Sequence, residues 1–183
     1  MPIATLIGYR GTGKSTVARL LASLRAASWI DADAVLEERL GCTIATLVRD
    51  RGEGAFRDAE ADVLASLLET FHGVLATGGG VVIRDANRRL LAELGRPIIW
   101  LTAPAATIRQ RLAADPSTFD RRPALQGTDA LAEVDVALQV REPLYAACAD
   151  WAIDTSDRSP AEVAEQIAAW LEGPGAGVGG GTP

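Results

Sequence analysis

Residues 8–16 read GYRGTGKST and match the pattern G-x-x-x-x-G-K-[ST]. Of the 18 lysines and arginines in the chain, only Lys14 is a lysine, and it occupies the lysine position of this pattern. An ammonium group on a flexible stem is compact enough to reach the β- and γ-phosphates of a nucleotide. The pattern therefore predicts a strand, a phosphate-binding loop and a helix whose N-terminus faces the phosphates.

The segments on either side of this loop have the periodicity that the pattern requires. Residues 3–7 are an apolar run typical of a buried strand. After the loop, apolar residues recur at the spacing of an amphipathic helix: Val17, Leu20, Leu21 and Leu24. This order of strand, loop and helix distinguishes the motif from a chance glycine-rich turn.

The residue types within the loop indicate what it binds. Its glycines allow the backbone to curl so that successive N–H groups point at an anion. Ser15 places a hydroxyl where Mg²⁺ accompanies the nucleotide. We therefore predict an ATP site with one Mg²⁺ ion, formed by Gly11, Thr12, Gly13, Lys14, Ser15 and Thr16.

Strand and helix signals alternate along the chain, which predicts an α/β fold with a parallel sheet and helices on both faces. The expected strands are 3–7, 29–31, 73–77, 97–102 and 151–154. The expected helices are 14–26, 33–40, 44–51, 54–69, 86–94, 104–114, 129–149 and 160–171. Because Pro143 lies within 129–149, we expect that helix to kink or restart there.

The chain is expected to form one domain over residues 1–172. Within it, residues 114–128 lack clean periodicity and contain two arginines, as expected of a mobile lid that carries a cation to a phosphoryl group. Residues 173–183 are rich in glycine and proline, so a disordered tail is predicted.

The net charge of −6 argues against a general nucleic-acid or acidic-membrane surface. No run of 18 apolar residues and no secretory signal is present, so no membrane association is expected. Cys42 and Cys148 lack metal-type spacing and are interpreted as reduced thiols, which favours a cytoplasmic location. The one histidine, His72, is expected at the surface.

Two carboxylates, Asp31 and Asp33, follow the second expected strand, where ligands of α/β sheets bind. Strand alternation places both on one side. One carboxylate there is suited to supporting Mg²⁺ through water, and the other to an acceptor hydroxyl. The alternative is helix capping, because Asp is common immediately before a helix for that reason alone.

Glycines and arginines elsewhere are also candidates. Gly78, Gly79 and Gly80 follow the third expected strand and either admit a ligand to the backbone or form a plain flexible turn. Arg57 and Arg141 each need an anionic partner, either an internal carboxylate or a bound acid. A further group is expected on a solvated helix face: Arg84, Arg88 and Arg89.

Taken together, these segments resemble the shikimate kinase family over about residues 3–171. The segments that carry the resemblance, in order, are GYRGTGKST at 8–16, IDAD at 30–33, EGAFRDAEADVL at 53–64, ATGGGVV at 76–82, RRPAL at 121–125 and REPLYAACADWAIDT at 141–155. The resemblance implies a three-layer P-loop fold whose five-stranded parallel sheet has the order 2-3-1-4-5. It also implies transfer of the ATP γ-phosphate to the 3-hydroxyl of shikimate in chorismate biosynthesis.

On the acceptor side, the resemblance implies that Asp33 binds the shikimate hydroxyls and orients or deprotonates the 3-hydroxyl. Arg57 and Arg141 would clamp the shikimate carboxylate. The backbone of Gly79, flanked by Gly78 and Gly80, would also lie against the substrate.

On the nucleotide side, Lys14 would contact the β- and γ-phosphates, Ser15 would bind Mg²⁺ and Asp31 would support the ion through water. Arg122 is the expected lid cation because it directly precedes Pro123. The adenine side would be formed by Arg111 and by Arg158 in the loop 155–160. The implied catalytic residues are thus Lys14, Asp33 and Arg122.

Two other functions remain open from the residues. A gluconate-type kinase would share the phosphate-binding loop without needing the acceptor set, and a catalytically silent nucleotide-binding module would lack part of that set. The expected partners are ATP and shikimate, with no nucleic acid and no membrane, and the family resemblance implies a monomer.

Overall fold

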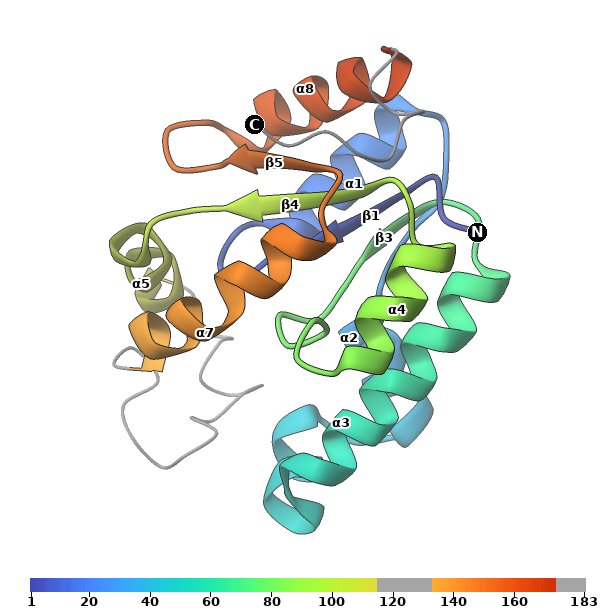
Figure 1. Cartoon of the computed structure of the whole chain (residues 1–183), viewed down its shortest axis with the longest axis vertical. Helices are drawn as coiled ribbons and strands as arrows, with labels where there is room; N and C mark the ends of the chain where they lie inside the picture. The colour runs from blue at the N-terminus through green and yellow to red at the C-terminus, as the bar shows by residue number, and fades with distance from the viewer. Residues whose placement is uncertain (115–132, 174–183) are drawn as a thin grey trace.

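The computed structural model describes residues 1–114 and 133–173 (Figure 1). One sheet of five parallel strands runs in the order β2-β3-β1-β4-β5, which confirms the predicted fold class and strand order. The strands are β1 Ala4–Ile7, β2 Trp29–Asp31, β3 Val74–Ala76, β4 Ile98–Thr102 and β5 Trp151–Asp154. The helices are α1 Lys14–Leu24, α2 Ala32–Leu40, α3 Ile44–Thr70, α4 Asp85–Leu94, α5 Ala105–Ala114, α7 Glu133–Cys148 and α8 Pro160–Glu172.

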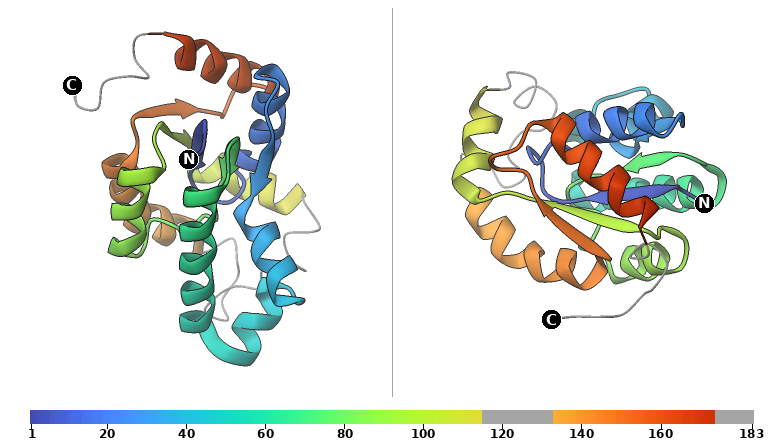
Figure 2. Two further views of the ribbon diagram at one scale, coloured as in Figure 1. Left: turned by 90° about the vertical axis from the view of Figure 1, so that its right-hand side faces the viewer. Right: turned by 90° about the horizontal axis from the view of Figure 1, so that it is seen from above.

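Helices cover both faces of the sheet (Figures 1 and 2). Strand alternation sends Leu6 to the face packed by α1 and α8 and sends its neighbour Ile7 to the face packed by α2, α3, α4 and α7. Both side chains are fully buried. The near-continuous apolar strands seen in the sequence are thus explained by burial on two faces.

The helix α3 contains a kink at Gly52, whose φ of 81° and ψ of 169° are not helical. Such a positive φ is accessible to glycine at little cost. The two separate helices predicted over 44–51 and 54–69 therefore correspond to the two halves of α3. Thr43 caps the first half, because its hydroxyl accepts a hydrogen bond from the Thr46 N–H.

The helix α7 runs through Pro143 without interruption, so of the two predicted alternatives, a kink or a restart, the restart was wrong. The part of the predicted lid beyond Ala114, including Arg122, lies outside the described residues, as does the tail from residue 174. Among the described helices, none is long and apolar enough to cross a membrane. Cys42 and Cys148 are both unpaired.

The carboxyl ends of the first three strands meet at one edge of the sheet. Of these three strands, β3 lies in the middle. It pairs with β1 through Leu6↔Ala76 and with β2 through Asp31↔Ala76. Three segments therefore emerge side by side: the loop 8–13, the start of α2 and the glycine loop, which we define as residues 78–83. This is the edge at which ligands of open α/β sheets bind.

Candidate active site

A cavity of ≈ 560 Å³ opens at this edge of the sheet. Its lining combines residues of the loop 8–16 with residues from α2, the glycine loop and α5. The predicted site residues among them are Gly11, Gly13, Lys14, Ser15, Thr16, Asp31, Asp33, Gly79 and Arg111. The structure thus brings most of the predicted nucleotide residues and two predicted acceptor residues into one cavity. The other predicted site residues that the structure describes do not line it: Thr12, Arg57, Gly78, Gly80, Arg141 and Arg158.

The loop 8–13 has the conformation that the motif predicts. Gly13 precedes α1 with a φ of 91°, a left-handed conformation that favours glycine. The side chain of Lys14 is buried, and its Nζ donates hydrogen bonds to the carbonyls of Gly8 (2.8 Å) and Tyr9 (2.9 Å). The ammonium is therefore held at the mouth of the loop, beside the N-terminus of α1.

Ser15 and Asp31 form the pair predicted to hold a metal. The Ser15 hydroxyl donates a hydrogen bond to Asp31 Oδ2. The other oxygen of Asp31 accepts the backbone N–H of Asp33 at 2.9 Å and so caps α2. Capping therefore falls to Asp31, and Asp33 lies in the first turn of the helix.

The donor set of this pair fits Mg²⁺. A hydroxyl and a carboxylate are hard oxygen ligands, and Mg²⁺ is commonly held by one or two protein groups together with water and substrate phosphates. Among the described residues, no cluster of three or more His, Cys, Asp or Glu side chains offers a cage for a metal ion.

Two carboxylates converge on Gly78. A Cβ added to Gly78 would lie 2.7 Å from Glu60 Oε1 and 2.8 Å from Asp33 Oδ1. Both contacts are closer than real Cβ atoms make, so a side chain at Gly78 would displace one carboxylate. The first glycine of the triplet therefore makes room for acidic side chains from α2 and α3.

Arg57 is buried in an ion-pair cluster on α3. Its Nη1 lies 2.9 Å from Glu60 Oε2, its Nη2 lies 3.0 Å from Glu53 Oε1, and its guanidinium lies 4.7 Å from the ring centre of Phe56. Internal carboxylates thus partner this arginine, which was one of the two predicted alternatives. The cluster fixes the guanidinium in a single direction.

Glu60 is a buried carboxylate beside the glycine loop that the sequence interpretation missed. The residue is 5% exposed, and within the described part of the chain its Oε1 has no hydrogen-bond partner. Burial raises the pKa of this carboxyl, while the neighbouring Arg57 charge opposes the rise. Its position three residues after Arg57 on a predicted helix was the available signal.

The glycine loop is anchored rather than freely flexible. Asn87, which is 2% exposed, donates from Nδ2 to the Val81 carbonyl at 3.0 Å. Arg88 donates from Nη1 to the carbonyls of Val82 (2.7 Å) and Ile83 (2.9 Å). The expectation that Arg88 belongs to a solvated helix face was therefore wrong, although Arg89 on the same helix is exposed.

Arg141 approaches the glycine loop from α7. Its guanidinium lies 5.4 Å from the ring centre of Tyr9, and its Nη1 lies 3.4 Å from the Gly79 carbonyl. Among the described residues, the salt bridges do not include Arg141. In this respect Arg141 differs from Arg57, whose partners are Glu53 and Glu60.

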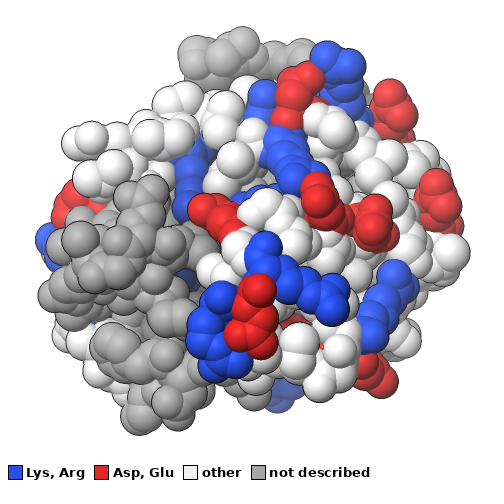
Figure 3. All heavy atoms as spheres, turned by 90° about the horizontal axis from the view of Figure 1, so that it is seen from below, with Lys and Arg blue, Asp and Glu red and all other residues white. Residues whose placement is uncertain are grey.

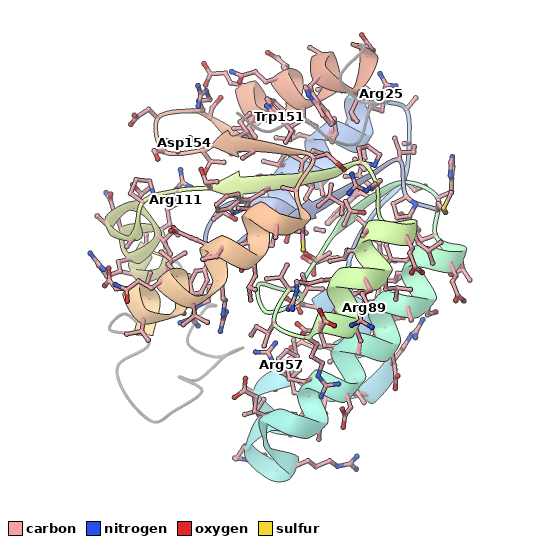
Figure 4. The ribbon with its side chains drawn as sticks, in the orientation of Figure 1. Arg25, Arg57, Arg89, Arg111, Trp151 and Asp154 are labelled. Carbon is pink, nitrogen blue, oxygen red and sulfur yellow. The ribbon has the colours of Figure 1, made fainter. Side chains whose placement is uncertain are left out.

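Two further arginines were predicted near adenine. Arg111 joins α5 to the loop after β5, because its Nη1 donates to Thr155 Oγ1 at 2.9 Å and to the Gly11 carbonyl at 3.3 Å. Arg158 donates to the Asp154 carbonyl at 2.6 Å. Figure 4 shows Arg111 beside β4 and β5, well separated from Arg57 on α3. Arg111 and Arg57 thus lie in different parts of the site.

The surface seen from below carries both signs of charge, with Lys and Arg interspersed among Asp and Glu over the described residues (Figure 3). Such mixing does not produce the extended basic stripe of a nucleic-acid-binding face. On this face, no described patch of a single positive sign competes with the local arginines of the site for an anionic ligand.

Comparison with known proteins gives a consistent result. The family profile described as shikimate kinase matches residues 10–172. The shikimate kinase of Rhodopirellula baltica is 41% identical over 162 residues, which cover 88% of this chain and 86% of that protein. The structure of shikimate kinase from Acinetobacter baumannii in complex with shikimate has a TM-score of 0.84 and 33% identity, covering 92% of this chain and 90% of its own.

A gluconokinase from Sinorhizobium meliloti has the same fold at a TM-score of 0.58. Its identity to this chain is 15%, over 92% of this chain and 90% of its own. This likeness extends to the fold alone, and the fold therefore does not separate the two kinds of kinase.

Proposed function

This chain belongs to the shikimate kinase family and is a phosphotransferase with shikimate as its alcohol acceptor, and we propose that the cavity described above is its active site. The observation that carries the proposal is the cavity's lining. Lys14 and Ser15 of the nucleotide loop share it with Asp33 and Gly79 of the predicted acceptor set. One cavity therefore has the groups for a phosphate donor next to the groups for a hydroxyl acceptor.

On the donor side, we propose that ATP binds along the loop 11–16. Lys14 then exchanges the carbonyls of Gly8 and Tyr9 for phosphate oxygens, and the N-terminus of α1 adds its partial positive charge. Arg111 and Arg158 would lie toward the adenine. Both are anchored around the loop after β5, which supports a role in holding the nucleotide rather than in transfer.

Ser15 and Asp31 would hold the Mg²⁺ of the nucleotide, Ser15 directly and Asp31 through water. The ion, when bound, neutralises charge on the β- and γ-phosphates. Their hydrogen bond keeps the two oxygens adjacent, and the cap that Asp31 forms on α2 keeps its carboxylate in place.

On the acceptor side, Asp33 would accept a hydrogen bond from the 3-hydroxyl of shikimate and orient it toward the γ-phosphate. Its position in the first turn of α2, capped by Asp31, restricts the direction of this carboxylate. Positioning of this kind supplies much of the catalysis in phosphoryl transfer.

Arg57 and Arg141 would bind the shikimate carboxylate from two directions, with the glycine loop between them. A planar guanidinium matches a carboxylate with two parallel hydrogen bonds. The two arginines differ: Arg57 is held by Glu53 and Glu60, whereas Arg141 is held by the Tyr9 ring and the Gly79 carbonyl. Arg122, in the predicted lid, would bring a positive charge to the phosphoryl group during transfer.

We further propose that the protein acts as a single-domain monomer in the cytoplasm. The two unpaired cysteines support a reducing compartment.

The test is ADP release from ATP and Mg²⁺ with shikimate, quinate, gluconate or no acceptor. Turnover with shikimate alone supports the proposed site. Turnover with gluconate as fast as with shikimate would reject the proposed recognition of the shikimate hydroxyls by Asp33, because gluconate shares the carboxylate but not the ring. Binding of ATP without turnover on any acceptor would identify a silent nucleotide-binding module.

A further inference from the structure

Every carbonyl of the glycine loop accepts a hydrogen bond. Two of these bonds lie within the loop: Val81 N–H donates to Gly78 O at 3.2 Å, and Ile83 N–H donates to Gly80 O at 3.0 Å. The carbonyls of residues 81–83 are held from α4 by Asn87 and Arg88. Only the Gly79 carbonyl is held from α7.

The group that holds Gly79 is the hydroxyl of Tyr145, which donates to the Gly79 carbonyl. Tyr145 is fully buried, and its ring stacks on Trp100 at a centroid distance of 5.7 Å and an interplanar angle of 28°. Burial raises the pKa of this hydroxyl well above its ordinary value. The hydroxyl therefore remains protonated, and so remains a donor, at any pH at which the protein works.

Fixing this carbonyl has a defined effect on the backbone. A trans peptide is planar, with its N–H opposite its C=O. A hydrogen bond that orients the Gly79 carbonyl therefore also orients the Gly80 N–H. On its other side Gly79 lies against the nucleotide loop, since a Cβ there would be 3.1 Å from the Arg10 N. Gly79 is thus held between α7 and the nucleotide loop.

The same carbonyl also orients the acceptor arginine. Arg141 precedes Tyr145 by four residues, so both side chains project from one face of α7. Arg141 Nη1 lies 3.4 Å from the Gly79 oxygen that Tyr145 contacts. One carbonyl oxygen is therefore shared by the hydroxyl of the stacked Tyr145 ring and by the guanidinium of the proposed acceptor residue Arg141.

We propose that Tyr145 is a positioning residue for shikimate: through the Gly79 carbonyl it fixes the Gly79–Gly80 peptide and the Arg141 guanidinium in the geometry that receives the substrate carboxylate. This inference rests on the proposed acceptor site. Tyr145 acts through Gly79 and Arg141 and does not touch the substrate itself.

Tyr145→Phe tests the proposal because it removes the hydroxyl and keeps the ring stacked on Trp100. The KM for shikimate should rise about fivefold, the effect of one neutral hydrogen bond. The KM for ATP should change less than twofold, because the nucleotide loop keeps its own hydrogen bonds. An unchanged KM for shikimate, or a parallel rise for both substrates, overturns the proposal.

Trp100→Phe is the matched control. It reduces the packing around Tyr145 but retains the hydroxyl, so it should lower thermal stability and raise the KM for shikimate less than Tyr145→Phe does. A rise in this KM equal to that of Tyr145→Phe would assign the effect to packing and overturn the proposal.

A second measurement does not depend on the Tyr145 variant folding. The chain has only two tyrosines, so 3-fluorotyrosine labelling gives two ¹⁹F resonances, and Tyr9→Phe identifies the one from Tyr145. Shikimate added without ATP should shift the Tyr145 resonance, because its hydroxyl shares an acceptor with Arg141. A Tyr145 resonance that does not move at saturating shikimate overturns the proposal.

Arg141→Ala distinguishes a failure of the proposed acceptor site from a failure of the proposed role of Tyr145. If it leaves shikimate binding intact, the proposed acceptor site fails. If it weakens binding while Tyr145→Phe does not, only the role of Tyr145 fails.

Discussion

Gly80 lies directly against the guanidinium of Arg57. A Cβ added to Gly80 would stand 2.0 Å from Arg57 Nη1 and 2.6 Å from its Cζ. The guanidinium cannot shift easily, because Arg57 is buried and paired with Glu53 and Glu60. The absence of a side chain at residue 80 is therefore a condition for the position of the arginine.

Gly80→Ala should consequently displace Arg57 from its two carboxylates. We expect the KM for shikimate to rise at least about tenfold and the unfolding free energy to fall by about 1–3 kcal/mol, as overpacking of a tight site does. Steady-state kinetics with both substrates and urea unfolding measure the two effects.

Gly54→Ala is the control for that substitution. Nothing lies within 4 Å of a Cβ at Gly54, which is exposed and helical within α3. The variant should keep its KM for shikimate and gain up to about 1 kcal/mol of stability from helix propensity. Equal kinetic effects of the two alanines would contradict the close approach of Gly80 to Arg57.

Arg141→Ala should raise the KM for shikimate by about 10- to 100-fold, with a smaller change in kcat. The reason is the loss of charge-assisted hydrogen bonds to the carboxylate. Arg89→Ala is the matched control, since Arg89 is 77% exposed and pairs only with Asp85 at the surface. Isothermal titration with shikimate measures the difference, and similar affinities in both variants would reject the clamp.

Arg122→Ala should lower kcat by at least about 100-fold and raise the KM for shikimate much less, because a lid cation acts on charge that develops during transfer. Arg121→Ala is the neighbouring control and should retain most of the turnover. The opposite split between kcat and KM would make Arg122 a substrate-binding residue.

Stability should depend on pH through Glu60. Burial raises the pKa of this carboxyl above its ordinary value of 4.5, so the folded protein holds the proton more tightly than the unfolded chain. The unfolding free energy should therefore fall as the pH rises from 4.5 through the raised pKa.

Glu60→Gln removes this ionisation while keeping the shape of the side chain. Urea unfolding between pH 4.5 and pH 8 should show that the stability of the parent protein declines relative to that of the variant. Parallel curves for the two proteins would show that Glu60 does not titrate in this range.

Lys14→Ala should reduce kcat by at least about 100-fold, because the phosphates lose their main side-chain cation. Lys14→Arg keeps the charge and should also lose turnover, since a planar guanidinium does not replace a compact ammonium in a tight loop. Turnover close to that of the parent protein in Lys14→Ala would reject the assignment of the loop.

The parts of the site that follow from local sequence were predicted well. Strand β1, the loop 8–13 and α1 are adjacent in the chain, and a single motif with its flanking periodicity specifies all three. The five strands were likewise predicted because each is an apolar run bounded by polar or turn residues. The strand order needed the family resemblance, because pairing between distant strands has no local signal.

The interactions that were missed depend on tertiary structure. Glu60 is marked in sequence only by its spacing of three residues from Arg57, and its contact with Gly78 depends on how α3 packs against the glycine loop. Arg88 and Arg89 are neighbours in sequence, yet only Arg88 reaches the glycine loop, because the packing of α4 decides which side is covered. The continuous course of α7 through Pro143 also had no local signal, because proline in a helix interior usually ends or bends the helix.

Because the chain has one lysine, its nucleotide loop can be modified selectively by a chemical reagent. Apart from the α-amino group, the only primary amine is Nζ of Lys14, which is buried against the carbonyls of Gly8 and Tyr9. An amine-selective acylating reagent therefore has a single side-chain target, and bound nucleotide should protect it. Mass spectrometry of that one modification would count occupied loops directly, without a label on the substrate and without any engineered residue.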